Sequence, residues 1–214
     1  MTQTAYHGAG TSTARAVCVF IHGRAQSPEE MVETVLPRLD APGLRFALPR
    51  SPREGWYDAK AVDDMTEMTE TQLAEALGIV RRAVEDARRD CPDVPIIVAG
   101  FSQGACMTIE YLMHGGRADA AAMLTGCRVA APSDTLARAP LSGMPIYATC
   151  GDADPWIPIW AFQKAVGELA AAGARVRSDI LPGRPHEVSD AECAEFSRIL
   201  RAVSGGAVPL EGAA

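Results

Sequence analysis

Short apolar runs alternate along this 214-residue chain with longer segments in which apolar residues recur every three or four positions. The run AVCVFI at 16–21 contains no polar side chain, which is typical of a central strand buried on both faces of a parallel sheet. By contrast, Leu73, Leu77 and Val80 share one side of a helix, and nearby arginines fall mostly on the other. The pattern predicts strands at 16–21, 44–48, 94–99, 120–125, 144–150 and 174–181.

Helical segments separate most of these strands. A serine followed by a proline and two acidic residues predicts that the first helix begins after Ser27, and Pro37 should end it early. Strands that alternate with helices predict an α/β fold with a mostly parallel, doubly wound sheet. Further helices are expected around 73–87 and at 104–113, 160–171 and 189–203.

The alternation continues through the chain without a linker, an internal repeat or an insertion long enough for a large cap domain. We therefore expect residues 1–214 to form one α/β domain, with flexible tails at 1–14 and 205–214. Ligands of such sheets bind beyond the carboxyl ends of the strands, so reactive side chains should follow the strands directly.

Composition and charge exclude several classes of function. The net charge is −7 and no block of Lys or Arg occurs, which argues against nucleic acid as a partner. No apolar run approaches the roughly 20 residues of a membrane span, and residues 1–6 lack the features of a secretory signal, so a cytoplasmic protein is expected. The six cysteines show no metal-ligand spacing, so no metal site is expected.

The sequence Gly-Phe-Ser-Gln-Gly at 100–104 joins a predicted strand to a predicted helix. A G-x-S-x-G motif in this position is typical of a nucleophile elbow, a sharp turn that exposes a serine hydroxyl above the sheet. Glycines are needed there because the neighbouring backbone leaves no room for a Cβ atom. Ser102 is therefore the predicted nucleophile.

A serine hydroxyl needs a base to accept its proton and a carboxylate to orient that base. Of the four histidines, His7 lies in the predicted tail, and His22 precedes the serine, against the order Ser–acid–His of triads built on such an elbow. His114 lies at the far end of the helix that follows Ser102, about 18 Å away at ~1.5 Å per residue. His186, in the loop after the last predicted strand, is the predicted base.

The carboxylate should lie between Ser102 and His186, at the carboxyl end of a strand. Asp152 and Asp154 both follow the predicted strand 144–150 and fit this position. Either aspartate can also form a turn with its own backbone, and the spacing does not separate the two. We favour Asp154 as the acid and Asp152 as an organiser of the loop.

A tetrahedral intermediate also needs an oxyanion hole made of preorganised N–H donors. The backbone N–H of Gln103, the residue after the nucleophile, is one predicted donor. The loop after strand 16–21 should supply the second donor, the N–H of Arg24, because Gly23 allows the backbone to approach closely.

The candidate chemistry is carried by five motifs: IHG at 21–23, WYD at 56–58, GFSQG at 100–104, GDADPWIP at 151–158 and HEV at 186–188. In this order they resemble the phospholipase/carboxylesterase family of α/β-hydrolases, which includes acyl-protein thioesterases. The resemblance spans residues 16–203 and implies an α/β-hydrolase fold that hydrolyses carboxylic esters or thioesters without a cofactor. It also implies that Asp154 is the acid. Ala25 and Pro185 stand where glycine is usual in that family.

The residues that would bind the acyl group are inferred from their place in the loops. Trp56 and Tyr57 follow the second predicted strand, and Trp156 follows the acid. Met65 and Met68 lie in a polar segment that suits a flap over the site. We expect these five side chains to line a substrate groove, although aromatic and methionine clusters also occur in cores.

The leading hypothesis is a serine carboxylesterase that hydrolyses short- to medium-chain carboxylic esters through an acyl-enzyme. One alternative is an acyl-protein thioesterase or lysophospholipase that acts on long acyl chains. Another is a non-catalytic binding protein on a hydrolase fold, because a fold alone does not guarantee activity. The expected partner is an ester, either a small molecule or a molecule with an acyl chain, and the sequence leaves open whether the chain forms a homodimer.

Overall fold

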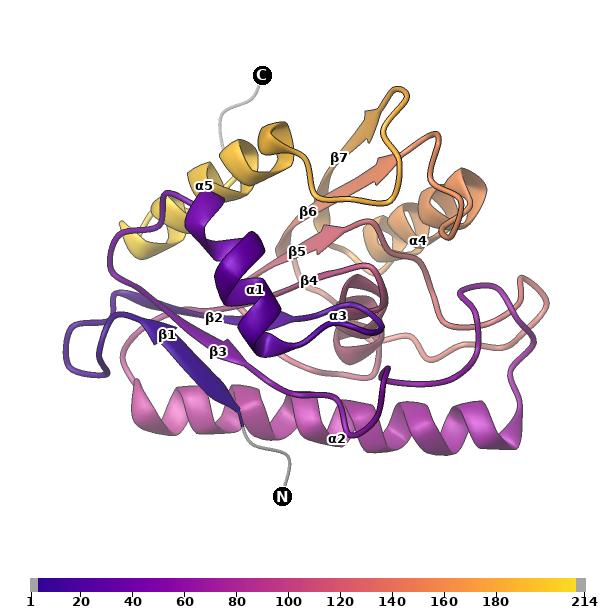
Figure 1. Ribbon diagram of the computed structural model, residues 1–214, viewed down its shortest axis with the longest axis horizontal. Coiled ribbons are helices and arrows are strands. Elements are labelled where there is room, and N and C mark those ends of the chain that lie inside the picture. The colour runs from indigo at the N-terminus through magenta and orange to yellow at the C-terminus, as the bar shows by residue number, and fades with distance from the viewer. Residues whose placement is uncertain (1–3, 211–214) are drawn as a thin grey trace.

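The computed structural model describes residues 4–210, and in this part of the chain seven strands form one sheet with helices on both faces (Figure 1). The sheet order is β1-β3-β2-β4-β5-β6-β7, and every neighbouring pair is parallel except β1 with β3. The prediction of a mostly parallel α/β sheet is therefore confirmed. The strands are β1 (Ala5–Gly8), β2 (Ala16–Ile21), β3 (Leu44–Leu48), β4 (Ile96–Phe101), β5 (Ala120–Leu124), β6 (Pro145–Gly151) and β7 (Arg175–Leu181).

The helices divide between the two faces of the sheet. α1 and α5 share one hydrophobic core with one face, whereas α2, α3 and α4 share a second core with the other face. The predicted start of the first helix is confirmed, because the Ser27 hydroxyl accepts a hydrogen bond from the N–H of Glu30 at 3.2 Å. The helices are α1 (Pro28–Thr34), α2 (Glu67–Asp90), α3 (Gln103–Met113), α4 (Ile159–Ala171) and α5 (Asp190–Ser204), and a short 3-10 helix, η1 (Leu36–Arg38), contains Pro37.

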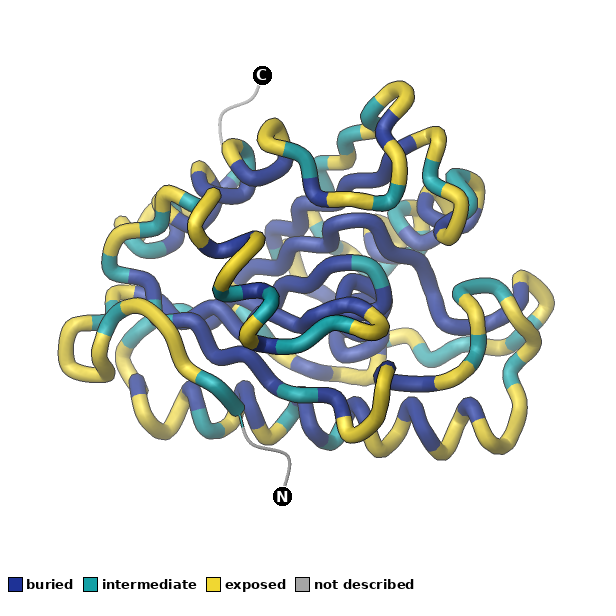
Figure 2. Tube along the Cα trace, viewed as in Figure 1, coloured by how far each residue is buried: buried dark blue, intermediate teal, exposed yellow. Residues whose placement is uncertain are grey.

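The burial pattern explains why these segments form their elements. Every residue of β2 and β4 is buried, as expected for central strands covered on both faces. Along α2, buried and exposed residues alternate with the helical period, so that one stripe packs on the sheet (Figure 2). Within residues 4–210, no helix is both long and apolar enough to cross a membrane.

The N-terminal segment is an edge strand, so the prediction of a flexible tail at 1–14 is wrong for the residues after 4. β1 pairs antiparallel with β3, and Tyr6 lies opposite Ala47. The Arg45 guanidinium lies over the Tyr6 ring, 4.4 Å from its centroid. The strand forms because the edge of β3 offers unpaired backbone groups. The side chains of β1 are mostly exposed, so its sequence does not show the pattern of a buried strand.

At the C-terminal end, residues 205–208 after α5 are exposed, whereas Pro209 is buried and Leu210 partly buried. The N–H of Ala207 donates to the carbonyl oxygen of Ala202 at 2.9 Å, and Leu210 packs against the core beneath α1 and α5. The predicted tail at 205–214 is therefore wrong for residues 209–210, and flexibility of residues 205–208 stays a prediction. Residues 1–3 and 211–214 lie outside the described residues.

Two long connections, 49–66 and 125–144, follow the carboxyl ends of β3 and β5, and neither contains a helix. The second is anchored by the buried side chain of Arg128, whose Nε lies 2.8 Å from Glu110 Oε1 and whose Nη1 lies 2.7 Å from Glu168 Oε2. An ion pair buried this far depends on such close geometry, because both charges have lost their water. The connection is thereby fixed to α3 and α4, beside the edge of the sheet where the site lies.

Candidate active site

The carboxyl ends of neighbouring strands bring the candidate residues together. In the parallel register the ends of β4 and β5 align, and so do the ends of β6 and β7. Ser102 follows β4 directly, while Asp154 and His186 lie in the loops after β6 and β7. Residues that are far apart in the sequence therefore meet at one edge of the sheet, as expected for this class of fold.

The turn at Ser102 has the backbone geometry of a nucleophile elbow. Ser102 lies between β4 and α3 with φ of +55° and ψ of −122°, a region that residues with side chains rarely adopt. A Cβ atom on Gly104 would lie 1.9 Å from the carbonyl oxygen of Ile21, and one on Gly100 would lie 2.4 Å from the carbonyl oxygen of Gly104. The two glycines are therefore required for α3 to pack against the strands. Backbone strain of this kind clusters at functional sites.

A continuous chain of hydrogen bonds joins Ser102, His186 and Asp154. His186 Nε2 lies 2.7 Å from Ser102 Oγ, and His186 Nδ1 lies 2.7 Å from Asp154 Oδ2. Because an ionised carboxylate can only accept, Nδ1 carries a proton and donates it. In the neutral imidazole, Nε2 then has a free lone pair toward the serine hydroxyl. This arrangement can remove the hydroxyl proton as the oxygen attacks an electrophile.

The structure separates the two aspartates that the sequence spacing left open. The Asp154 side chain is fully buried against His186, and its Oδ1 accepts hydrogen bonds from two backbone N–H groups of the following turn at 2.8 and 2.9 Å. Asp152 is exposed, and its Oδ1 accepts a hydrogen bond from the N–H of Gly183 at 2.6 Å. Asp154 is therefore placed to orient the imidazole, and Asp152 joins the loop after β6 to the loop after β7.

Two backbone N–H groups near Ser102 are available to a ligand. Neither the N–H of Gln103, the first residue of α3, nor that of Arg24 has an acceptor among residues 4–210. Gly23 brings the second group close, because a Cβ atom on Gly23 would lie 3.2 Å from Ser102 Cβ. The start of α3 also carries the positive end of the helix dipole, which favours negative charge. Gln103 is thus next to the serine in the chain, and Arg24 follows the glycine whose backbone approaches the serine.

The match to known protein families covers nearly all of the described chain. Residues 7–204 match the phospholipase/carboxylesterase family. The chain belongs to this family. A search of curated proteins finds no match.

Solved structures show how far the fold of this family member is shared. A phospholipase/carboxylesterase from Dyadobacter fermentans is similar at 24% identity, with a TM-score of 0.84 over 94% of this chain and 97% of that one. The esterase PE8 is 21% identical, with a TM-score of 0.76 over 94% of this chain and 99% of that one. The Bacillus cereus carboxylesterase is 16% identical, with a TM-score of 0.75 over 95% of each chain. These similarities show that the fold is that of an α/β-hydrolase.

Trp56 and Tyr57 do not line a substrate groove in this family member, so that part of the prediction is wrong. Their exposed fractions are 0% and 2%. Trp56 donates from Nε1 to the carbonyl oxygen of His22 and from its N–H to Gln103 Oε1, both at 2.8 Å. Gln103 Nε2 donates to the carbonyl oxygen of Tyr57 at 2.8 Å. The two aromatic residues therefore tie the loop after β3 to the loop after β2 and to the first turn of α3.

The Arg24 side chain braces the same connection. Its Nη2 donates to the carbonyl oxygens of Tyr57, Asp58 and Ala59 at 3.0, 3.0 and 2.7 Å. The next residue, Ala25, has φ of +56°, a left-handed conformation that glycine adopts at lower cost. The Arg24 guanidinium thus holds the backbone whose N–H is the predicted oxyanion donor.

The other three predicted groove residues lie in segments at the carboxyl edge, and their contact with substrate stays a prediction. Met65 is partly buried against the core, and its N–H donates to Asp134 Oδ2 at 3.0 Å. Met68, in the first turn of α2, and Trp156 are each 64% exposed. Their side chains are accessible to a ligand, whereas Met65 is held in place by the packing of its segment.

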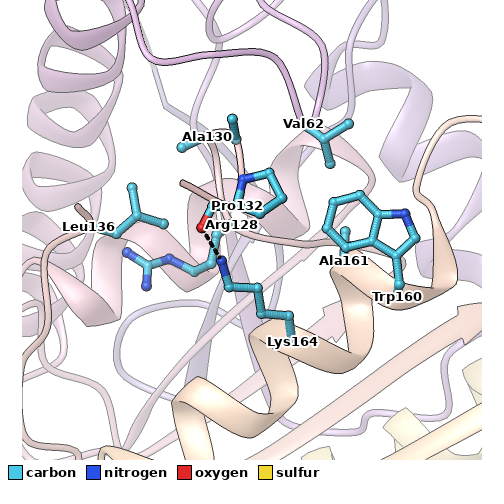
Figure 3. Close-up of a pocket in the computed structure, with 9 residues that line it drawn as sticks. Val62, Arg128, Ala130, Pro132, Leu136, Trp160, Ala161 and Lys164 are labelled. Carbon is cyan, nitrogen blue, oxygen red and sulfur yellow. Dashed lines mark hydrogen bonds between the residues drawn. The ribbon is translucent and has the colours of Figure 1, made fainter. Parts of the chain in front are cut away.

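A small pocket lies between the connection after β5 and α4 (Figure 3). Val62, Leu136 and Trp160 contribute apolar walls, and Figure 3 shows the Trp160 ring beside Val62. Lys164 and Pro132 also line the pocket, and Lys164 Nζ donates to the carbonyl oxygen of Pro132 at 3.1 Å. None of the three residues of the hydrogen-bonded chain lines this pocket, so it is separate from the serine hydroxyl.

Two residues that contact the His186 segment escaped the sequence analysis. The Phe101 ring packs on the imidazole, with 5.1 Å between the ring centroids. Arg184 is only 6% exposed and donates to the carbonyl oxygens of Pro185 and Glu187, each at 2.6 Å. Phe101 is one of the two variable residues of the G-x-S-x-G motif, so its place beside Ser102 was a signal in the sequence. An arginine in a Pro/Gly-rich loop is typical of a solvated residue, so the sequence contained no signal for the role of Arg184.

His22 is a structural residue of the loop after β2. It is 1% exposed, with Nδ1 2.7 Å from the carbonyl oxygen of Gly23 and Nε2 3.2 Å from the N–H of Ser51. A carbonyl oxygen only accepts and an N–H only donates, so Nδ1 carries the single proton of a neutral ring. Burial, the largest cause, lowers the pKa of His22, because a charged imidazolium would lose its water.

We expect this histidine to make the fold less stable at acidic pH. The pKa of His22 is lower in the folded state than in the unfolded chain, so the unfolded chain binds a proton more readily. The free energy of unfolding is therefore fully retained above the pKa of the unfolded chain and decreases as the pH falls below that pKa. Between pH 7.5 and 5.5, the wild-type protein should lose up to about 1.4 kcal/mol more unfolding free energy than His22→Asn, taking an unfolded pKa of about 6.5. Asparagine keeps a donor for the Gly23 carbonyl but does not titrate. Urea unfolding at both pH values checks this, and equal losses in the two proteins would contradict it.

Proposed function

We propose that this member of the phospholipase/carboxylesterase family is a serine carboxylesterase with Ser102 as the nucleophile, His186 as the general base and Asp154 as the orienting acid. The observation that carries the proposal is the unbroken pair of 2.7 Å hydrogen bonds from the serine hydroxyl through the imidazole to a fully buried carboxylate. A buried carboxylate without such a partner would be costly, so its placement favours a working triad over a chance cluster.

The reaction begins when Ser102 Oγ attacks the ester carbonyl carbon and its proton passes to His186 Nε2. The carbonyl oxygen becomes an oxyanion, which the N–H groups of Gln103 and Arg24 stabilise. Collapse of this intermediate breaks the bond to the alcohol, which leaves with the proton from the imidazolium. Water then attacks the acyl-enzyme by the same route and releases the acid. Asp154 stays ionised throughout and stabilises the imidazolium.

For the substrate we propose carboxylic esters with short to medium acyl chains. The two fully buried aromatic residues, Trp56 and Tyr57, cannot wall a deep acyl tunnel, while Met68 and Trp156 offer exposed apolar surface. An acyl chain on such a surface buries limited apolar area, so carbons added beyond a medium length should not strengthen binding further. The solved structures of an esterase and a carboxylesterase with the same fold support the ester class. Long-chain thioesterase or lysophospholipase activity and a purely binding role remain the alternatives.

The first prediction concerns the nucleophile. Ser102→Ala should lower kcat for p-nitrophenyl butyrate by at least about 10⁴-fold while the protein still folds, because no other hydroxyl takes the place of Oγ. A fluorophosphonate should label the wild-type protein at Ser102, as identified by peptide mass spectrometry. Full activity in the alanine variant, or labelling elsewhere, would overturn the proposal, and a folded wild-type protein without esterase or thioesterase activity would favour the binding role.

The second prediction separates the two aspartates. Asp154→Asn should lower kcat by about 10⁴-fold, because the amide no longer fixes the imidazole tautomer. Asp152→Asn is the matched control: its amide oxygen can still accept from the N–H of Gly183, so kcat should stay close to that of the wild-type protein. Steady-state kinetics on one ester measures both, and the reverse ranking would show that the acid is wrongly assigned.

The third prediction concerns acyl length. Across p-nitrophenyl esters, kcat/KM should rise by at most about fourfold per added methylene, since each buried methylene contributes about 0.8 kcal/mol, and then level off at medium length. Trp156→Ala should change this profile, whereas Tyr6→Ala on the edge strand β1 should not. An optimum at palmitoyl esters or palmitoyl thioesters would instead favour the long-chain alternative.

A further inference from the structure

We infer that Arg184 is a positioning residue, which holds the His186 loop in register with Ser102 and uses Glu192 as its buried counter-ion. The effect on catalysis rests on the proposed esterase function, but the effect on the imidazole does not. Nothing in the family motifs above assigns a role to either residue.

The guanidinium clamps the chain on both sides of the histidine. Arg184 Nη1 donates to the carbonyl oxygen of Pro185 and to that of Glu187, each at 2.6 Å. These are the residues immediately before and after His186. Because both bonds come from Nη1, the planar guanidinium keeps Nη2 and Nε for other partners in a fixed geometry, which a single ammonium nitrogen cannot do. The backbone that carries the imidazole is thus fixed at both ends.

The same guanidinium reaches the strand beside the nucleophile. Arg184 Nη2 donates to Thr125 Oγ1, and Thr125 is fully buried directly after β5. The Ser102 N–H donates to the carbonyl oxygen of the preceding residue, Leu124, at 3.0 Å. Thr125 also has φ of +63°, an outlier for a β-branched residue of the kind found at functional sites. Arg184 therefore links the histidine loop to the strand end that holds the elbow.

Glu192 supplies the counter-charge from the first turn of α5. Its Oε2 lies 3.3 Å from Arg184 Nε and accepts a hydrogen bond from the N–H of Ser189 at 2.8 Å, while its Oε1 accepts from Thr149 Oγ1 at 2.5 Å. The Glu192 side chain is fully buried and that of Arg184 nearly so. A buried pair with these additional hydrogen bonds is held rigidly, and removing one partner leaves an uncompensated charge.

The backbone around Arg184 is packed as tightly as its side chain. A Cβ atom on Gly151, at the end of β6, would lie 2.0 Å from the carbonyl oxygen of Arg184. The loop that carries His186 therefore rests directly on the strand that leads to Asp154. A small movement of this loop would lengthen both hydrogen bonds of the imidazole together.

Arg184→Lys tests the inference, because it keeps a charge opposite Glu192, but a single ammonium cannot reach both carbonyls and Thr125 Oγ1 as the two Nη atoms do. On p-nitrophenyl butyrate, kcat should fall by about 10- to 100-fold with KM little changed, the cost expected when a reacting group is displaced by about 1 Å. Arg177→Lys on β7 is the matched control: Arg177 pairs with Asp179 and Glu195 and should tolerate the exchange without loss of kcat.

A double-mutant cycle separates positioning from general stability. In a His186→Ala background, Arg184→Lys should cause little further loss of the residual rate, because the group through which it acts is gone. An undiminished loss in that background would show that Arg184 does not act through the histidine. If Arg184→Lys fails to fold, Arg184→Met combined with Glu192→Gln removes both charges together, and the same loss of kcat is expected.

A readout that needs no activity completes the test. The proton on His186 Nδ1 should give a downfield NMR resonance in the wild-type protein, assigned by its absence in His186→Ala. This resonance should broaden or shift in Arg184→Lys and stay unchanged in Arg177→Lys. An unchanged resonance together with an unchanged kcat would overturn the inference. A wild-type protein without esterase activity would overturn the proposed function, and the resonance would still decide the role of Arg184.

Discussion

The backbone of Gly104, in the first turn of α3, approaches the carbonyl oxygen of Ile21 at the end of β2 so closely that a Cβ atom would lie only 1.9 Å from that oxygen. This contact places the start of the helix against the loop that follows β2. Ser102 and Gln103 are consecutive in the chain, and this backbone approach brings the loop that contains Gly23 and Arg24 beside them. A side chain at position 104 would push the helix off the strand and separate the hydroxyl from the second N–H. The geometry of the site thus depends on the absence of a Cβ atom at position 104.

Hydrogen bonds between side chains and backbone N–H or carbonyl groups hold the loops that lie beyond the strand ends. The Gln103 amide bonds the backbone of Trp56 and Tyr57, and the Arg24 guanidinium bonds the same connection. Arg184 does the same on both sides of His186. Backbone groups beyond the strand ends have no ladder partner, so amide and guanidinium side chains supply one. Loops fixed in this way hold the proposed oxyanion donors and the proposed base in position before a substrate binds, and such preorganisation is the source of the stabilisation that an oxyanion hole provides.

The hydrophobic pattern predicted an element correctly where the segment's own apolar residues cause it to be buried. It failed where the position of a segment depends on contacts with another segment. The run at 16–21 is the strand β2, and the strand predicted at 94–99 is β4, shifted two residues along because Gly100 and Phe101 still pair with β5. β1 was missed because its stability comes from the open edge of β3 rather than from its own apolar residues. Trp56 was placed at the surface because a loop motif does not show that the loop folds inward.

By itself the sequence determined the alternation of strands and helices, the elbow, and the pairing of Ser102 with His186 as candidate nucleophile and base. These follow from local periodicity and from the rule that reactive groups come after strands. Only the tertiary structure placed Asp154 rather than Asp152 against the imidazole, buried Trp56 and made Arg184 a clamp on the histidine loop. Each of these depends on which backbone groups lie nearby in space, and a one-dimensional pattern does not contain the partners of a hydrogen bond between distant loops.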